Sequence, residues 1–283
     1  MNRRLFLKTS VAAVVPSVPV AAAGYGLFEA SWVRIDRRTV PLPRLPRPFD
    51  GLTVAFLTDI HHGPYTPIEY VQAVVRTTLT LQPDLIVLGG DYSHRGGQYI
   101  APCFEALAGL QAPLGVYGVF GNHDYWNGAD ETRQAMGSAG VRELTNDGVW
   151  LSRGGERFRL AGVDDLWAGR PDLDAALGDA RPDDTCLLVS HNPDLAETLR
   201  DRRVGLMLSG HTHGGQVVFP SGGAPYTSSR YGQKYLHGLV QAPVTRVFVS
   251  RGLGTTHLPV RVGSRPEINL LTLASAPPAS AVG

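Results

Sequence analysis

The sequence has only two cysteines among its 283 residues, Cys103 and Cys186. Both lie in apolar stretches and are far apart along the chain, which favours packed thiols over a disulfide scaffold. Because no cysteine belongs to any group of candidate metal ligands, the sequence also argues against a structural zinc cage built on thiolates. The two cysteines carry little information about the redox compartment.

The chain also has little excess of charge of either sign. The formal net charge is +1, and it falls to −2 when the three cationic residues of the N-terminal segment, Arg3, Arg4 and Lys8, are left out. The body of the chain has no run of like charges, no low-complexity block and no repeat at a fixed period. Binding to long nucleic acids depends on neutralising many phosphates. The composition therefore argues against long nucleic acids as partners.

The N-terminus has the features of an export signal. Arg3-Arg4 is followed by Leu5-Phe6-Leu7-Lys8 and an uncharged stretch from Thr9 to Phe28, in which Ala21-Ala22-Ala23 supplies small residues for cleavage. This order resembles a twin-arginine signal peptide, and it predicts the twin-arginine export machinery as a partner. The uncharged stretch is barely long enough to span a bilayer and contains prolines and glycines. Cleavage is therefore favoured, and a retained membrane anchor is the alternative.

The chain is predicted to have four parts. Residues 1–23 are the signal peptide; residues 24–48 are an edge strand, from Trp32 to Val40, and a proline-rich extended strap, from Pro41 to Pro48. Residues 49–275 form the main domain, and residues 276–283 form a flexible tail. A length of 283 residues fits one large domain or two small ones.

The order of apolar runs predicts the fold class. In the first half of the main domain, strand-like runs alternate with stretches of helical spacing, which indicates parallel βαβ units. The second half is richer in strands. Predicted helices cover 67–81, 99–110, 129–139 and 192–199, and predicted strands of the second half cover 149–151, 157–163, 216–219, 245–249 and 268–273. An α/β fold, with a two-sheet β-sandwich flanked by helices, accommodates both halves.

Five short segments place metal-ligating residues directly after apolar, strand-like runs. They are Asp59-Ile60-His61, Gly90-Asp91, Gly121-Asn122-His123-Asp124, Ser190-His191 and Gly210-His211-Thr212-His213. Sites in open α/β sheets form beyond the carboxyl ends of the strands. We therefore expect all five segments to meet at one edge of one sheet, in a single site of two carboxylates, one asparagine carbonyl and several imidazoles.

These side chains suit borderline and harder divalent ions, which favour imidazole and carboxylate over thiolate. Two ions about 3.5–4 Å apart need a shared carboxylate. Asp91 is the natural bridge, because it ends a central strand and has no other acid nearby in its loop. Asp59 and His61 alternate along an extended segment, so both can point at one ion, and His211 and His213 can do the same.

In this order, over about residues 50–275, the five segments resemble the calcineurin-like metallophosphoesterase family. The Gly-Gly-Asp-Tyr and Gly-His-Thr-His-Gly-Gly-Gln variants resemble its bacterial exported or membrane-associated phosphodiesterase branch. The resemblance implies one ion on Asp59, His61 and His213, a second on Asn122, His191 and His211, and Asp91 bridging both. It also implies that His123 is a general acid at the leaving group, with Asp124 holding its ring and favouring its protonated form. Tyr125 and Trp126 either form a substrate wall or pack in the core.

The resemblance implies an exported, two-metal phosphodiesterase whose nucleophile is a metal-bridging hydroxide. The ions would be Mn²⁺, Fe²⁺/Fe³⁺ or Zn²⁺. A diester is favoured because the motifs contain no arginine clamp for a dianion. Export, and an anchor if it is retained, suggest a phospholipid, a lipid-linked or another envelope diester, outside the cytoplasm and near a membrane surface. A nucleotide pyrophosphatase or nuclease is the alternative enzyme, and a non-catalytic metal-binding scaffold is the alternative class; His123 favours an enzyme.

Overall fold

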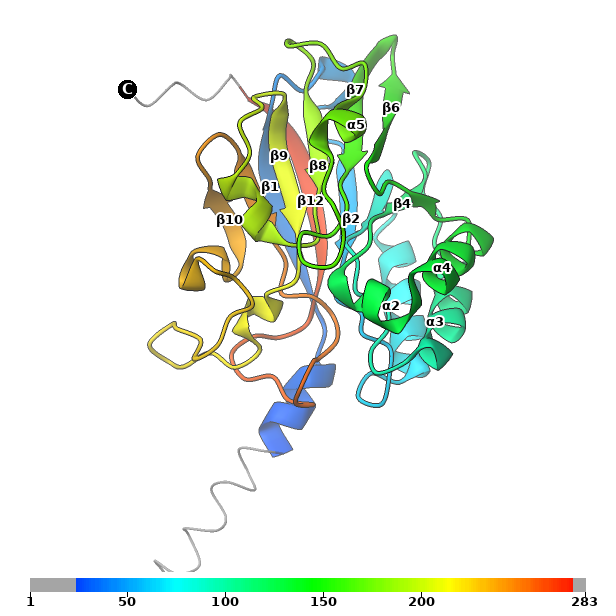
Figure 1. Cartoon of the computed structure of the whole chain (residues 1–283), viewed down its shortest axis with the longest axis vertical. Helices are drawn as coiled ribbons and strands as arrows, with labels where there is room; N and C mark the ends of the chain where they lie inside the picture. Colours follow the sequence, from blue (N-terminus) through cyan, green and yellow to red (C-terminus); the bar gives the residue numbers. More distant parts are fainter. Residues whose placement is uncertain (1–23, 277–283) are drawn as a thin grey trace, which may run out of the picture.

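The computed structural model describes residues 24–276. Two six-stranded sheets face each other, and helices cover the outer face of one of them (Figure 1). The predicted fold class, an α/β fold with a two-sheet sandwich flanked by helices, is therefore confirmed. The predicted signal peptide, residues 1–23, and all but the first residue of the predicted tail lie outside the described residues.

The first sheet is mixed and carries the larger helices. In spatial order its strands are β1 (Arg34–Pro43), β12 (Glu267–Ala276), β2 (Thr53–Leu57), β3 (Leu85–Leu88), β4 (Val116–Gly118) and β5 (Arg142–Glu143). β2 to β5 are parallel, and β12 is antiparallel to β2. The outer face is covered by α2 (Ile68–Thr80), α3 (Ile100–Leu107) and α4 (Asn122–Ser138). These helices are the crossovers that parallel neighbours require.

The second sheet has a parallel centre and antiparallel edges. Its spatial order is β10 (Gly238–Gln241), β11 (Arg246–Val249), β9 (Val204–Ser209), β8 (Cys186–Val189), β7 (Glu156–Gly162) and β6 (Asp147–Arg153). β11, β9, β8 and β7 are parallel. The short helix α5 (Leu173–Leu177) contacts β6 and β7, and the 3-10 helix η3 (Pro193–Glu197) contacts β9 and β11. The other 3-10 turns are η1 (Arg47–Phe49), η2 (Gly97–Tyr99), η4 (His213–Gly215) and η5 (Gly232–Tyr235).

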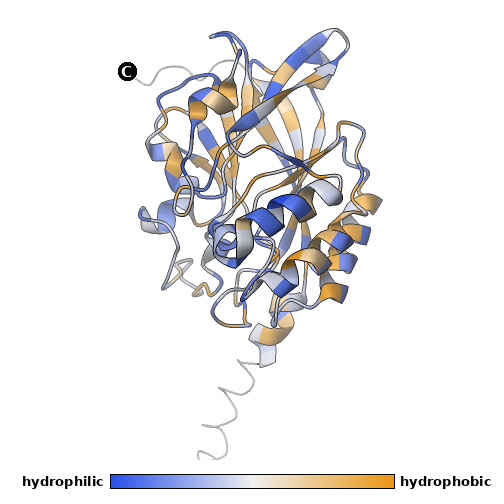
Figure 2. Cartoon of the chain, turned by 45° about the vertical axis from the view of Figure 1, so that its right-hand side comes forward, coloured by the Kyte–Doolittle hydropathy of each residue, from blue (hydrophilic) through white to orange (hydrophobic). Residues whose placement is uncertain are grey.

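Alternation along the strands divides the apolar residues between two layers. In β2, Val54 and Phe56 point into the core between the sheets, whereas Ala55 and Leu57 pack against the helices. Successive side chains of a strand face opposite sides, so a strand buried on both faces needs an unbroken apolar run. Figure 2 shows the resulting apolar centre and the mixed polar and apolar faces of the helices.

Four elements differ from the predictions, and the first is the helix predicted over 192–199, which is only the 3-10 helix η3. The edge strand β1 continues through Pro41 to Pro43, pairing with β12, so the predicted strap is shorter; an edge strand tolerates proline because one side of its backbone needs no partner. Helix α4 begins at Asn122, seven residues before the predicted start at 129. The predicted strand 216–219 is wrong: Val217 makes only an isolated bridge with Val262.

An additional helical segment opens the described chain. Residues 24–31 are helical and directly precede the edge strand, at the lower end of the molecule in Figure 1. Within residues 24–276, no helix combines the length and apolarity that a membrane crossing needs.

Candidate metal centre

The five motifs meet at one end of the sandwich. Three follow β2, β3 and β4 of the first sheet, and two follow β8 and β9 of the second. The expectation that they share one edge of one sheet is therefore wrong. β8 and β9 pair with β7 and β11, so their motifs reach the site from the opposite layer.

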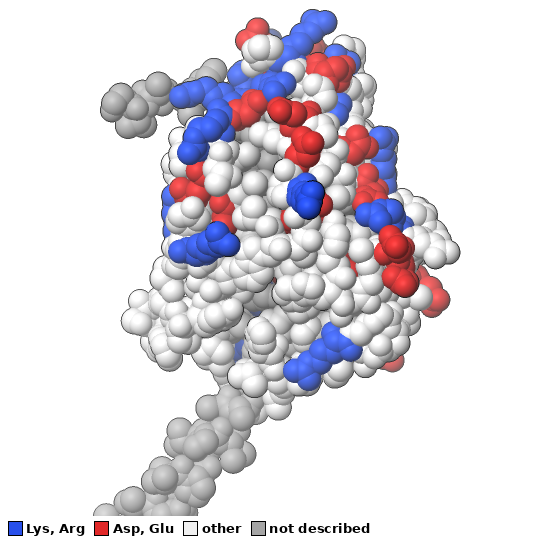
Figure 3. Space-filling view, in the orientation of Figure 1, with Lys and Arg blue, Asp and Glu red and all other residues white. Residues whose placement is uncertain are grey.

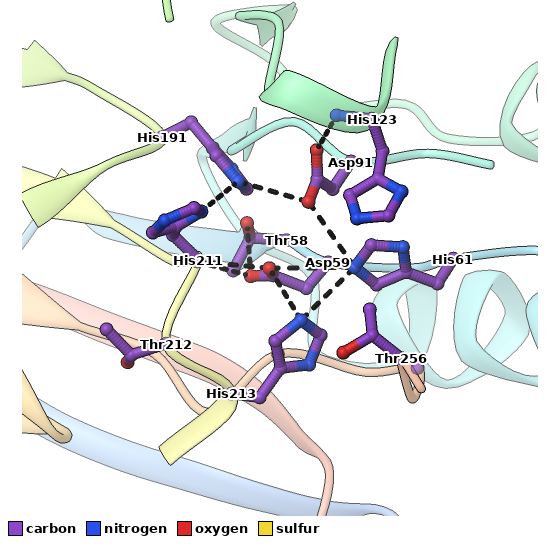
Figure 4. A network of polar contacts seen from close by, with 12 residues as sticks. Thr58, Asp59, His61, Asp91, His123, His191, His211, Thr212, His213 and Thr256 are labelled. Carbon is purple, nitrogen blue, oxygen red and sulfur yellow. Dashed lines mark hydrogen bonds and ion pairs between the residues drawn. The ribbon is translucent and has the colours of Figure 1, made fainter. Parts of the chain in front are cut away.

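His61, His94 and His123 form one group of candidate metal ligands at the site, and two further clusters are fully buried. One is formed by Asp59, His61 and His213, and the other by Asp91, His191 and His211; the ligand atoms within each cluster lie within 4.8 Å of one another. All six residues are buried. Figure 4 shows them converging from both layers.

Asp91 lies between the two clusters. Its Oδ2 atom is 3.4 Å from Nε2 of His61 and 3.2 Å from Nε2 of His191. One carboxylate oxygen is thus near an imidazole of each cluster, which is the position that a shared ligand requires. The backbone N–H of His123 donates to the other oxygen, Oδ1, at 2.9 Å and holds the carboxylate in this orientation.

The backbone is strained at the candidate ligands. Five of them have a positive φ: Asp59 at 53°, His61 at 48°, Asp91 at 58°, His211 at 69° and His213 at 54°. A non-glycine residue in this region costs on the order of 1–3 kcal/mol. The strained residues alternate within two motifs, Asp59/His61 and His211/His213, and the packed strands before the motifs stabilise these conformations. Such strain typically accompanies a functional arrangement.

Neighbouring glycines allow the close approach of the loops. A Cβ atom on Gly210 would lie 2.1 Å from Oδ2 of Asp59, and one on Gly121 would lie 2.3 Å from Oδ1 of Asp91. Real Cβ atoms do not approach oxygen this closely, so both positions need glycine. The glycines in the motifs therefore serve packing against the carboxylates.

Hydrogen bonds from outside the clusters orient the candidate ligands. Nδ1 of His191 lies 2.8 Å from the carbonyl oxygen of Gly89, so the N–H at Nδ1 donates and Nε2 faces the site, where it offers a lone pair once the ring is neutral. Thr58 Oγ1 donates to Oδ2 of Asp59 at 2.9 Å, and the backbone N–H of His211 donates to Oδ1 at 3.0 Å. The ligand atoms are therefore fixed before any ion binds.

The donor set fits divalent cations. Nε2 of His61 and Nε2 of His213 are 3.2 Å apart, and Nδ1 of His211 and Nε2 of His191 are also 3.2 Å apart. A cation between such nitrogens would satisfy their lone pairs together. Oδ1 of Asn122 is buried and has no hydrogen-bond partner among the described residues. An amide oxygen left in this state suits a role as a metal ligand.

Burial keeps most of the imidazoles neutral. It lowers the pKa of His61 and His213 well below the usual value and lowers the pKa of His211 to about 3. For His191, burial acts in the same direction, but Asp91 outweighs it and raises the pKa well above the usual value. Burial raises the pKa of Asp59 to about 6. Neutral imidazole is the form that binds metal.

Asp124 does not hold His123, which corrects the sequence expectation. Its carboxylate accepts three backbone N–H groups, from Asp91, Tyr92 and Gly121. It therefore braces the loop that carries Asp91. Burial lowers the pKa of His123, although Asp91 acts to raise it, so the expected preference for a protonated ring is not met.

The ring of His123 is placed by other side chains. Its Nδ1 is 3.4 Å from Nδ1 of His94, and its ring centroid is 4.8 Å from that of Trp126, which is exposed. Tyr125 donates a hydrogen bond to Asp164. His123 is only partly buried and stands beside the two clusters, on the first turn of α4.

Three further side chains at the site, Asp165, Trp167 and Arg261, were not identified from the sequence, whereas His94, in the loop after Asp91, is either a contact to substrate phosphate or a loop charge on the sequence alone. Asp165 is fully buried, and its Oδ2 has no partner among the described residues. The ring centroid of Trp167 is 4.2 Å from that of His211. His94 contacts His123, and the buried Arg261 donates to the carbonyl oxygen of His213 at 3.3 Å. Only Asp165 could have been recognised from the sequence, because it follows the apolar end of strand β7 in the same way as Asp59 follows β2 and Asp91 follows β3.

Buried imidazoles and carboxylates at the strand ends of a two-layer α/β sandwich define a metal-dependent hydrolase. The ligand-bearing loops come from both layers, and the rigid strands before them fix their positions. A partly buried histidine lies beside the ligand atoms but outside the two clusters built on the aspartates. This is the arrangement that a reaction at a metal-held substrate needs.

Comparison with known proteins agrees with this class. The model of the calcineurin-like phosphoesterase family matches residues 52–215. The uncharacterized metallophosphoesterase YkuE of Bacillus subtilis is 34% identical over 97% of this chain and 98% of its own. The phosphodiesterase YaeI of Escherichia coli is 30% identical over 96% and 99%. A transmembrane protein with metallophosphoesterase domain from Bos taurus is 34% identical over 98% of this chain and 64% of its own. The chain belongs to the calcineurin-like metallophosphoesterase family, and it is a metal-dependent phosphoesterase.

Proposed function

We propose that this protein is a two-metal phosphodiesterase that acts outside the cytoplasm on an envelope or lipid-linked diester. One ion would be held by Asp59, His61 and His213, and the other by Asn122, His191 and His211. Asp91 would bind both. The observation that carries the proposal is the position of Asp91 Oδ2, within 3.4 Å of His61 and 3.2 Å of His191.

The protein side chains divide the chemistry between them. When bound, the two ions would polarise the phosphoryl oxygens and lower the pKa of water toward neutrality. His123, beside the clusters and on the first turn of α4, would meet the leaving-group oxygen and, in its protonated form, supply the proton. His94 would hold the His123 ring through the contact between their Nδ1 atoms. Asp124 would act indirectly, by bracing the loop of Asp91.

A diester is favoured over a monoester on two grounds. The relative YaeI is named a phosphodiesterase. A monoester is a dianion and calls for additional cationic contacts, but the buried Arg261 is occupied by the carbonyl groups of Gly254, Ser264 and Arg251. The preference for a lipid-linked substrate is supported by the uncharged N-terminal stretch and by the name of the Bos taurus relative, which is a transmembrane protein.

We also propose export through the twin-arginine pathway to the periplasmic side. The support is the order of Arg3-Arg4, the uncharged stretch and the alanines before Gly24. This pathway carries folded proteins, which suits a chain whose ligands come from both layers of the fold. Cleavage after Ala23 is favoured over a retained anchor.

A hydrolysis screen with Mn²⁺-loaded protein tests the proposal. The substrates are a glycerophosphodiester lipid, bis(nitrophenyl) phosphate, nitrophenyl phosphate and a dinucleotide pyrophosphate. We expect the activated diester to be cleaved at least about tenfold faster, in kcat/KM, than the matched monoester. Chelation or Asp91→Asn should abolish the activity.

The other outcomes identify the alternatives. Preference for the monoester would make the protein a phosphatase. Cleavage of the dinucleotide pyrophosphate without cleavage of either diester would support a nucleotide pyrophosphatase. Full metal occupancy, measured by elemental analysis, without hydrolysis of any substrate would favour a metal-binding scaffold.

A further inference from the structure

The helical segment 24–31 carries an exposed apolar surface. The exposed fractions are 49% for Tyr25, 52% for Leu27, 56% for Phe28 and 46% for Trp32, which directly follows the segment. Single exposed apolar residues are common on soluble proteins. Four large ones within eight consecutive residues, 25–32, form an apolar patch that needs an explanation.

The inner side of this segment is firmly attached to the protein. The buried carboxylate of Glu29 accepts the backbone N–H of Ser264 at 2.9 Å, and the carbonyl oxygen of Gly26 accepts the N–H of Arg261 at 3.0 Å. Ser264 in turn donates from Oγ to the carbonyl oxygen of His213 at 2.9 Å. The apolar side chains are therefore held outward in a fixed orientation. Two hydrogen bonds, through Ser264, connect the segment to the candidate ligand His213.

An apolar cavity of about 220 Å³ lies between the segment and the loops of the metal centre. Its lining includes Leu27, Tyr65, Pro67, Leu253 and Pro259. The backbone N–H of Leu253 donates to the carbonyl oxygen of Thr58 at 3.1 Å, next to Asp59. Leu27 thus lies at the edge of an apolar cavity that is suited to a hydrocarbon chain. The inner wall of this cavity, at Leu253, adjoins the metal site.

The charge around the segment suits an anionic layer. The guanidinium of Arg265 lies 3.6 Å from the centroid of the Trp32 ring, and that of Arg95 lies 4.9 Å from the centroid of the Tyr65 ring. The acid of the segment, Glu29, is buried. Figure 3 shows few charged groups on the lower part of this face, among them a cluster of Lys or Arg atoms, whereas acidic and basic groups are mixed over the upper half and the right edge. Apolar side chains flanked by arginines are typical of binding to a membrane interface.

We propose that the outer side of residues 24–32, together with Leu258, docks onto a lipid bilayer and turns the metal centre toward it. We call this set the docking surface; Leu258 is 61% exposed and precedes Pro259 of the cavity. The choice of a bilayer over a protein partner is supported by Arg265 beside Trp32 and Arg95 beside Tyr65, whose charges suit anionic head groups at the edge of an apolar surface. The proposal deepens the proposed function, on which its relevance to a lipid-linked diester rests, but docking itself does not require hydrolysis.

A fluorophore at position 258 tests the proposal in the full-length chain. Cys103 and Cys186 are buried, so Leu258→Cys can be labelled selectively with a thiol-reactive nitrobenzoxadiazole. The matched control is Ser152→Cys, an exposed position on β6 at the opposite end of the molecule. With vesicles of equal parts phosphatidylglycerol and phosphatidylcholine, we expect emission at position 258 to rise at least about twofold and shift to the blue, and emission at position 152 to stay unchanged. Leu27→Ser with Phe28→Ser should remove the response at 258.

Three other outcomes would overturn the proposal. Flotation of the protein with vesicles but no response at position 258 would mean that a tether alone holds it. An equal response at both positions would mean nonspecific adsorption. No response and no flotation would leave a protein partner as the occupant. Hydrolysis of bis(nitrophenyl) phosphate, which is soluble, is followed in parallel: its loss in every variant, with the response at 258 intact, would count against the proposed function and not against docking.

Discussion

The Oδ2 atom of Asp91 lies 3.2 Å from Nε2 of His191, and both side chains are buried. Burial and Asp91 act in opposite directions on this imidazole, and Asp91 prevails by raising its pKa well above the usual value. His191 cannot turn away, because its Nδ1 faces the carbonyl oxygen of Gly89. The pair is therefore held in a geometry that either a proton or a cation must stabilise.

Removing the charge of Asp91 should remove most of the bound metal. In Asp91→Asn the shared ligand is lost, so both ions lose a contact, and we expect less than one ion per chain and almost no hydrolysis. Elemental analysis of the folded protein measures this. Asp84→Asn is the matched control, since Asp84 precedes the same strand at its opposite end and accepts from Thr53. Two ions per chain in Asp91→Asn would contradict the bridging role.

Sequence reasoning succeeded where a local pattern decides the structure. The runs before Asp59, Asp91, His191 and His211 are continuous and apolar, because these strands are buried on both faces. The motif residues follow the strands directly, so their common location could be deduced from the carboxyl ends of parallel strands. The division of the motifs between two sheets could not be deduced from the sequence, because strand pairing depends on contacts between distant parts of the chain.

The errors also have physical causes. The first turns of α4 are polar and contain Gly128, whose φ of 139° interrupts the helix, so apolar spacing becomes visible only after 129. The segment 216–219 is apolar enough for a strand, but Gln216 has a φ of 56° and Pro220 follows at once. The family resemblance places Asp124 against the ring of His123. Its carboxylate instead bonds backbone N–H groups 32 and 33 residues away.

Gly210→Ala should disturb the metal centre without replacing a ligand. The new Cβ atom would lie 2.1 Å from Oδ2 of Asp59, so that carboxylate or its loop must move. We expect a loss of on the order of 10-fold to 100-fold in metal affinity, as for changes to the groups that orient ligands. Gly137→Ala is the control: nothing lies within 4 Å of its Cβ atom on α4, and alanine there should stabilise the helix by roughly 0.5–1 kcal/mol. Titration calorimetry and thermal melting measure the two effects; equal metal affinity in both variants would contradict the role of Gly210.

Metal binding should release a proton, and more at lower pH. His61, His211 and His213 are already neutral at pH 7.5, because burial lowers their pKa values. His191 is protonated, because Asp91 raises its pKa despite burial, and it must lose its proton to bind. Burial raises the pKa of Asp59 to about 6, so below that pH this carboxyl must also deprotonate.

We therefore expect the ligands to release about one proton per chain at pH 7.5 and nearly two at pH 5.5, with weaker metal binding at the lower pH. A metal-bound water would add up to one further proton at pH 7.5. Titration calorimetry in buffers of different ionisation enthalpy counts the protons. Release of three or more at pH 7.5 would mean that burial does not keep the other imidazoles neutral.

Replacing Arg3 and Arg4 together by lysine should prevent export. The change keeps the charge and alters only the arginine pair that the twin-arginine machinery reads. We expect the variant to accumulate in the cytoplasm, measured by cell fractionation, and Lys8→Arg to be exported normally as the control. Mass spectrometry of the exported protein decides between cleavage after Ala23 and a retained anchor. Unchanged export of the double variant would point to another route.

His123→Ala should lower turnover while leaving the metal in place. Its ring lies beside the two clusters, 4.7 Å from that of His61 between centroids, but Asp59 and Asp91 each have two other imidazoles as cluster partners. Removing a general acid costs about 10²–10⁴-fold in kcat. The loss should be smaller on bis(nitrophenyl) phosphate than on an alkyl diester, because a nitrophenolate leaves without a proton. His237→Ala, at an exposed histidine, should change neither metal content nor kcat. Equal losses on both diesters would argue against leaving-group protonation, and loss of one ion would make His123 a ligand.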